Sequence, residues 1–174
     1  FSFNITPYLN ANGSQKIVLA VTDGTNFSSQ PRGKQQINAS GIYYTPVSGI
    51  WQTVWLESVS SETYLKEVKI TTDIDQNKVT IVPFSNIPLV DGYRVIVDVF
   101  YNSEKIVSGI TAPNEGLCLD IPEAKLWSPD HPHLYDIKLK FINLTGKVID
   151  EVDSYFGMRK ISLGDYKGVK YLFL

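Results

Sequence analysis

A polar stretch between Asn26 and Ser40, with the residues just after it, holds side chains that could bind a ligand rich in hydroxyl groups. Arginine, lysine and glutamine donate hydrogen bonds to hydroxyls or to a carboxylate, and the faces of tyrosine rings stack on the C–H surfaces of sugars. A long polar loop on a rigid sheet is where binding residues usually lie. The residues of these types are Arg32, Lys34, Gln35, Tyr43 and Tyr44.

A structural interpretation of the same five residues stays open. Arg32 and Lys34 could be solvated loop charges, and the two tyrosines could pack on a sheet. Binding is favoured over structure for Arg32 and Tyr44.

The other reactive side chains form no recognisable catalytic or metal-binding set. His131 and His133 flank a proline in an exposed turn and Cys118 is distant from them, so we predict no metal site and no cofactor. Cys118 lies between two leucines in a predicted strand with no basic residue near it, which predicts a buried, inert thiol. We predict no catalytic residue, because the glutamates lie among other polar residues on predicted strands or turns: Glu57, Glu62, Glu67, Glu104, Glu115, Glu123 and Glu151.

The elements that must position these residues are predicted to be β-strands throughout. Apolar residues alternate with a period of two, and helical spacing never persists beyond two turns. Residues 68–71 and 79–82 flank a hairpin loop at 75–78, and Val95, Val97 and Val99 are predicted to face a core. Seven such strands between about residues 62 and 163 predict an immunoglobulin-like β-sandwich.

The first 60 residues hold fewer strands, among them segments at 17–21 and 54–59. So few strands cannot close a sandwich, and unpaired strand edges invite association. We therefore expect either further strands of a longer polypeptide or a second chain to complete this part, and a dimer through strand edges is one possible outcome. The alternating run that begins at Phe1 suggests a boundary inside a longer sequence.

The overall composition excludes several classes of partner. The 174 residues are 43% hydrophobic and 20% charged, with a formal net charge of -2, which is ordinary for a globular protein. This charge gives no electrostatic footprint for nucleic acid or for an anionic membrane. No apolar run approaches the roughly 20 residues that cross a bilayer, so we expect neither nucleic acid nor a membrane as a partner.

Three segments carry a more specific signal, namely residues 31–57, 126–135 and 156–161. In this order and spacing they resemble glycoside hydrolase family 2, the family of β-galactosidases, β-glucuronidases and β-mannosidases. The run Ser-Gly-Ile-Trp-Gln-Thr-Val-Trp-Leu-Glu resembles the last strand of that family's jelly-roll sugar-binding domain. The runs Leu-Trp-Ser-Pro and Phe-Gly-Met-Arg-Lys resemble the closing strands of its immunoglobulin-like domain.

The resemblance implies a domain organisation and a role. Residues 1–60 would be the C-terminal part of the jelly-roll domain, 61–163 the immunoglobulin-like domain, and 164–174 the lead-in to a catalytic (β/α)8 barrel. Members are retaining enzymes whose two glutamates belong to that barrel. The chain is thus expected to be a non-catalytic accessory fragment of a glycosidase that acts on β-linked glycosides, with carbohydrate and the missing barrel as partners. A periplasmic or secreted location follows by analogy alone.

The resemblance also bears on the polar loop. In this family the loop before the Ser-Gly-Ile run can reach over the barrel mouth and touch the sugar, which makes Arg32, Lys34, Gln35, Tyr43 and Tyr44 candidates for substrate binding. The β-galactosidase and β-glucuronidase branches have an aspartate six residues before the glycine, where this chain has Tyr43. The exact sugar contacts of those branches therefore do not transfer.

Two alternative functions remain open. A free-standing carbohydrate-binding module could use the same tyrosines together with Trp51, although tryptophans in strand-like runs are more often core or interface residues, and we predict that role for Trp51, Trp55 and Trp127. A structural or adhesive β-sandwich protein would process no sugar.

Overall fold

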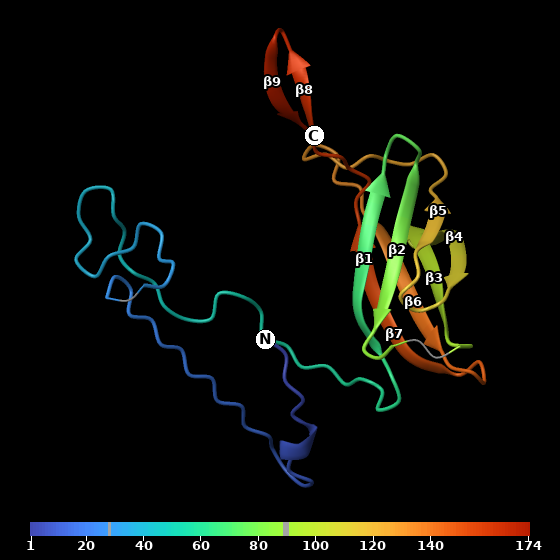
Figure 1. Cartoon of the computed structure of the whole chain (residues 1–174), viewed down its shortest axis with the longest axis horizontal. Coiled ribbons are helices and arrows are strands. Elements are labelled where there is room, and N and C mark those ends of the chain that lie inside the picture. Colours follow the sequence, from blue (N-terminus) through green and yellow to red (C-terminus); the bar gives the residue numbers. More distant parts are fainter. Residues whose placement is uncertain (28, 89–90) are drawn as a thin grey trace. The chain divides into compact units, whose positions relative to one another are not determined.

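The computed structural model of the chain describes residues 1–27, 29–88 and 91–174. These residues separate into two compact units, Phe1–Leu56 and Glu57–Leu174. Figure 1 shows that nearly all regular structure belongs to the second unit. Within the described residues, no helix has the length and apolar character needed to span a bilayer.

The second unit contains two antiparallel sheets that stack as two layers (Figure 1). One sheet has the order β1-β2-β5 and consists of Leu65–Asp73, Lys78–Ser85 and Leu117–Asp120. The other has the order β4-β3-β6-β7 and consists, in chain order, of Arg94–Tyr101 (β3), Glu104–Thr111 (β4), Tyr135–Ile142 (β6) and Val148–Phe156 (β7). The predicted all-β class and the seven-stranded sandwich are confirmed.

The core between the two sheets follows from the alternation in the sequence. Val95, Val97 and Val99 of β3 are completely buried, as predicted, because every second residue of a strand points to the same face. Ile137 and Leu139 of β6 continue the same layer. The facing sheet contributes Val79, Ile81 and Leu119.

The predicted hairpin loop at residues 75–78 is also present, since β1 ends at Asp73 and β2 begins at Lys78. The Asp73 carboxylate closes the turn by accepting hydrogen bonds from the backbone N–H groups of Asp75 and Gln76, both at 3.0 Å. Asn77 adopts a left-handed backbone with φ of 53°, which asparagine tolerates better than most residues.

One prediction for this unit is wrong. Cys118 is exposed, not buried. Strand β5 turns Leu119 into the core, so that the alternation of the strand directs Cys118 to the opposite face. Two flanking leucines therefore did not indicate burial of the residue between them.

The first unit lacks the strands predicted at residues 17–21 and 54–59. It contains a short 3-10 helix, Thr6–Tyr8, and among its described residues an isolated bridge between Gln35 and Tyr44. A strand needs a neighbour that receives its backbone hydrogen bonds, and neither segment has one in this structure. The apolar alternation indicates strand-like segments, but it does not show whether a neighbouring strand is present to pair with them.

The last strands, β8 (Ser162–Tyr166) and β9 (Val169–Phe173), pair with each other as a two-stranded hairpin. Leu163, Tyr166 and Leu172 are exposed on it. An isolated two-stranded hairpin is at best marginally stable in water.

Candidate functional site

Residues of the first unit surround a hollow of about 390 Å³, a size that suits a small ligand. Its lining is more polar than apolar and comes from three segments close to residues 21–25, 30–35 and 47–51. The side chains in the lining that bear on ligand binding are Asp23, Gln30, Arg32, Gln35, Ser48 and Trp51.

Asp23 accepts hydrogen bonds from all three segments. Its Oδ1 accepts from the backbone N–H of Thr25 at 2.7 Å and from the side-chain amide of Gln30, and its Oδ2 accepts from the Ser48 hydroxyl at 2.8 Å. The hydrogen bonds from Ser48 and Thr25 lower the pKa of Asp23 and outweigh the opposing effect of partial burial. The carboxylate is therefore ionised at neutral pH.

Gln35 supplies a second set of links. Its side-chain oxygen accepts a hydrogen bond from the backbone N–H of Val47 at 3.0 Å. Next to it, the N–H of Tyr44 donates to the carbonyl of Lys34 at 2.8 Å, and the N–H of Gln36 donates to the carbonyl of Tyr44 at 3.1 Å. Among the described residues of this unit, side-chain and bridge hydrogen bonds thus hold these segments, without support from a sheet.

The structure brings together two of the five predicted binding residues. Arg32 and Gln35 line the hollow, whereas Lys34, Tyr43 and Tyr44 are exposed and are not part of its lining. Arg32 forms no ion pair with any carboxylate of the described residues, so its guanidinium is available to a ligand.

Sequence reasoning missed Asp23 and Ser48 as members of this site. Asp23 precedes Gly24 in a pair typical of a turn, and Ser48 begins the Ser-Gly-Ile motif, which resembles a strand. Their proximity depends on how the chain folds between them, so no local pattern could have revealed it.

The predicted core position is wrong for Trp51 and Trp55, and the alternative of an interface position stays a prediction. Trp51 is 87% exposed and Trp55 is 73% exposed, so neither is a core residue within this chain. Trp51 instead lines the hollow, where an indole ring offers a stacking surface. Trp127 is half-buried in the second unit.

The two later motifs meet at one corner of the sandwich. The backbone N–H of Trp127 donates to the carbonyl of Met158 at 2.9 Å, and Leu126 forms a bridge with Met158, which is completely buried. The Arg159 guanidinium lies 5.1 Å from the centre of the Trp127 ring, within the range of a cation–π interaction.

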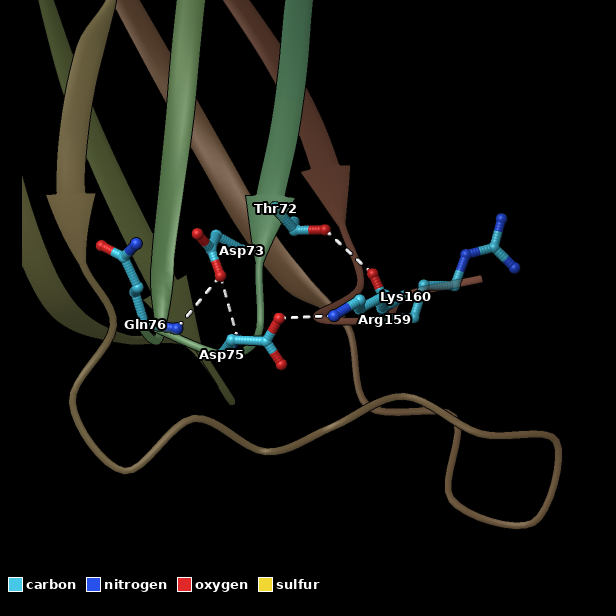
Figure 2. A network of polar contacts seen from close by, with 6 residues as sticks. All are labelled: Thr72, Asp73, Asp75, Gln76, Arg159 and Lys160. Atoms are coloured by element: carbon cyan, nitrogen blue, oxygen red, sulfur yellow. Dashed lines mark hydrogen bonds and ion pairs between the residues drawn. The ribbon is translucent and has the colours of Figure 1, made fainter. Parts of the chain in front are cut away.

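A polar network ties the same corner to the hairpin of β1 and β2 (Figure 2). Thr72 donates from its hydroxyl to the carbonyl of Arg159 at 3.1 Å, and Lys160 donates to the carboxylate of Asp75. The hydrogen bond to Asp75 raises the pKa of Lys160, and the charges of Asp75 and Asp73 add to this effect. These contacts give the motif at residues 156–161 a structural role, because they attach it to the β1–β2 hairpin.

The carboxylates beside the hollow described for the second unit are open to water. A second hollow, on the outer face of β6 and β7, contains Asp136 and Asp153, but both are exposed. Lys138 is the direct cross-strand partner of Asp153, and its Nζ lies 3.9 Å from the Asp153 carboxylate. This is an open sheet face that does not exclude water from either carboxylate.

Metal binding finds no support in the described residues, where no group of three or more His, Cys, Asp or Glu side chains could hold an ion. The Nδ1 of His133 instead lies 2.8 Å from the hydroxyl of Tyr101, and the ring of His131 stacks on that of His133. Both histidines are accounted for by these contacts.

Comparison with known proteins connects the chain to one family. The family described as glycosyl hydrolases family 2 matches residues 53–159. A β-galactosidase from Thermoanaerobacter pseudethanolicus is 21% identical over 95% of this chain and 22% of its own length. A putative β-glucuronidase from Formosa agariphila is 27% identical over 99% of this chain and 20% of its own length. The chain therefore spans about a fifth of the length of these relatives.

Among solved structures, a β-glucuronidase from Ruminococcus gnavus in complex with D-glucaro-d-lactam is similar to this chain. The two share 18% sequence identity with a TM-score of 0.49, over 59% of this chain and 17% of the other.

Proposed function

Because the chain belongs to glycosyl hydrolases family 2, we propose that it is a non-catalytic accessory region of a retaining glycosidase that acts on β-linked glycosides in carbohydrate metabolism. The relatives it matches are a β-galactosidase and a putative β-glucuronidase, of which the chain spans 22% and 20% of the length, respectively. In this proposal the residues that break the glycosidic bond belong to another part of the longer protein.

The observation that carries the proposal is the exposure of every glutamate. A retaining glycosidase holds two carboxyl groups about 5 Å apart, and its acid/base group needs a pKa raised by its surroundings. Such a pair requires an enclosed cleft, but all seven glutamates are exposed: Glu57, Glu62, Glu67, Glu104, Glu115, Glu123 and Glu151. The hollow of the first unit contains a single carboxylate, Asp23, which its hydrogen bonds keep ionised.

We further propose that the polar loop faces the sugar of the parent enzyme. Arg32 and Gln35 line the hollow together with Trp51, a combination of hydrogen-bond donors and a stacking surface that suits a pyranose. The charges of Asp23 and Arg32 balance, so the lining carries no net charge. Lys34, Tyr43 and Tyr44 are exposed beside these residues in sequence and would contact the sugar at the edge of the loop.

The experiment is an assay of the purified 174-residue chain with a panel of nitrophenyl β-glycosides, including galactoside, glucuronide and mannoside. The proposal predicts no nitrophenol release above buffer over many hours. Release that persists through a second purification step, and that disappears when one of the chain's own carboxylates is changed, would refute it.

The second candidate function is a free-standing carbohydrate-binding module, which the exposure of Trp51 at the edge of a hollow favours. It predicts saturable heat in calorimetry with a glycan, lost in Trp51→Ala. If the loop forms only part of a pocket, no saturable heat is expected at micromolar protein concentration. Calorimetry that detects no heat with any glycan of a panel therefore rules out this second candidate.

A further inference from the structure

We propose that Asp23 is a positioning residue of the sugar-facing hollow, because its carboxylate connects the segment that carries Arg32 and Gln35 to the other two segments of the lining without itself contacting the ligand. The part of this inference that concerns a sugar rests on the proposed function. The part that concerns the order of the loop depends only on this chain.

The first support is where the hydrogen-bond donors to Asp23 come from. Thr25, Gln30 and Ser48 belong to three segments, the last of which lies 25 positions from Asp23 in the sequence, and all three donate to the same carboxylate. A single acceptor with several donors from distant segments fixes their mutual position, as a sheet would do elsewhere.

The second support is the conformation of Thr25. This residue is only 6% exposed in a unit where most side chains are exposed, and its φ is 48°, in the left-handed region that costs a threonine energy. The N–H of Thr25 donates to the Asp23 carboxylate two residues earlier, which closes an Asx turn. Asp23 therefore compensates for a backbone strain that would otherwise open the turn.

The third support is that Asp23 has little capacity left for a ligand. An ionised carboxylate accepts about four hydrogen bonds, and the protein already supplies three of them. Arg32, by contrast, forms no ion pair among the described residues and lines the same hollow. The geometry thus separates a residue that orders the loop from a residue that is free to bind.

The consequence is a specific difference between two substitutions. In Asp23→Asn the side-chain oxygen still accepts from Thr25 and Gln30, and the new amide group can donate to the Ser48 hydroxyl, which is able to accept. In Asp23→Ala all three donors lose their acceptor. A positioning role therefore predicts that asparagine rescues what alanine destroys, whereas a ligand-binding role for the negative charge predicts that both variants fail.

The first arm of the test is amide hydrogen exchange on the full 174-residue chain. We expect exchange at Thr25 and Val47 to accelerate about tenfold in Asp23→Ala, the factor that corresponds to one ordinary hydrogen bond, and to stay near the parent rate in Asp23→Asn. The control is Gln15→Ala, which removes a separate polar contact with Asn10 and should leave both amides unchanged. Unchanged exchange in Asp23→Ala overturns the proposal.

The second arm is an NMR titration with high concentrations of methyl β-galactoside and methyl β-glucuronide. We expect shifts around Arg32 in the parent and in Asp23→Asn, and none in Asp23→Ala. Loss of the shifts in Asp23→Asn with normal exchange would mean that Asp23 contacts the sugar, which overturns the proposal. If no variant responds to sugar while the exchange pattern holds, the proposed sugar-facing function fails and the positioning role stands.

Discussion

A β-carbon on Gly157 would lie 3.1 Å from the Cβ of Trp127 and 3.2 Å from the edge of its indole ring. This contact is why a glycine separates Phe156 from Met158, both of which are buried in the core. The absence of a side chain lets Trp127 approach the backbone closely and places its ring beneath the guanidinium of Arg159.

Gly157→Ala should therefore destabilise the sandwich by about 1 kcal/mol, because the added methyl group must push Trp127 away by a few tenths of an ångström. Chemical denaturation followed by tryptophan fluorescence measures the change. Gly116→Ala is the matched control, since its β-carbon would meet only ordinary contacts at 3.6 Å or more. Equal losses of stability in the two variants would contradict the account.

Asp150 links the two sheets of the sandwich, because its carboxylate accepts a hydrogen bond from the backbone N–H of Leu65 at 2.7 Å. Leu65 is buried, so its N–H has little access to water as a substitute. Asp150→Ala should cost about 1–3 kcal/mol of unfolding free energy, the usual cost of a buried donor left without a partner. Asp153→Ala, an exposed change on the same strand, is expected to have a much smaller effect. Thermal or chemical denaturation measures both variants. If they lose the same amount of unfolding free energy, the hydrogen bond between Asp150 and Leu65 does not contribute to stability.

Asp98 gives a prediction about pH. Burial alone would raise its pKa, but hydrogen bonds from Ser108 at 2.6 Å and Lys105 at 3.2 Å, with the charges of Lys105 and Lys140, bring the pKa below its ordinary value of 3.8. The unfolded chain then binds the proton more tightly than the folded chain does. The stabilisation is fully present above pH 3.8 and is lost as the pH falls through the lower pKa of the folded state.

Asp98→Asn should accordingly lower the melting temperature at neutral pH, and the difference from the parent should shrink as the medium is acidified below pH 3.8. Thermal melts between neutral pH and about pH 2 measure this. A difference in melting temperature that stays constant over the whole pH range would show that the ionised carboxylate of Asp98 does not contribute to stability.

Arg32 and Lys34 allow a direct comparison of two cations in one loop, of which only Arg32 lines the hollow. Arg32→Ala should weaken sugar binding about tenfold, as expected for the loss of one charge-assisted hydrogen bond. Lys34→Ala should have a smaller effect on the same NMR titration, because Lys34 lies outside the lining and would contact the sugar only at the edge of the loop. Equal losses of binding in the two variants would indicate that the sugar is attracted by the positive charge of the loop and is not bound in the hollow.

The sandwich could be predicted from sequence because the alternation of apolar and polar residues within each strand indicates which of its faces is buried. The alternation of Val95, Val97 and Val99 needs no knowledge of distant residues, and neither does the turn at residues 75–78. The hollow could not be predicted in this way. Asp23 and Ser48 form a hydrogen bond only because of the path of the chain between them. The exposure of Cys118 depends on which face of its strand packs against the opposite sheet.

The proposed non-catalytic role can be tested through the covalent glycosyl-enzyme intermediate that a retaining glycosidase forms on its nucleophile. Incubation of the 174-residue chain with activated 2-deoxy-2-fluoro β-glycosides, followed by intact-mass spectrometry, detects that intermediate without requiring turnover. We predict an unchanged mass for every sugar tested, because the proposed function assigns the nucleophile to a part of the enzyme outside these 174 residues. A mass increase of one fluoroglycosyl group, mapped to a carboxylate of this chain, would contradict it.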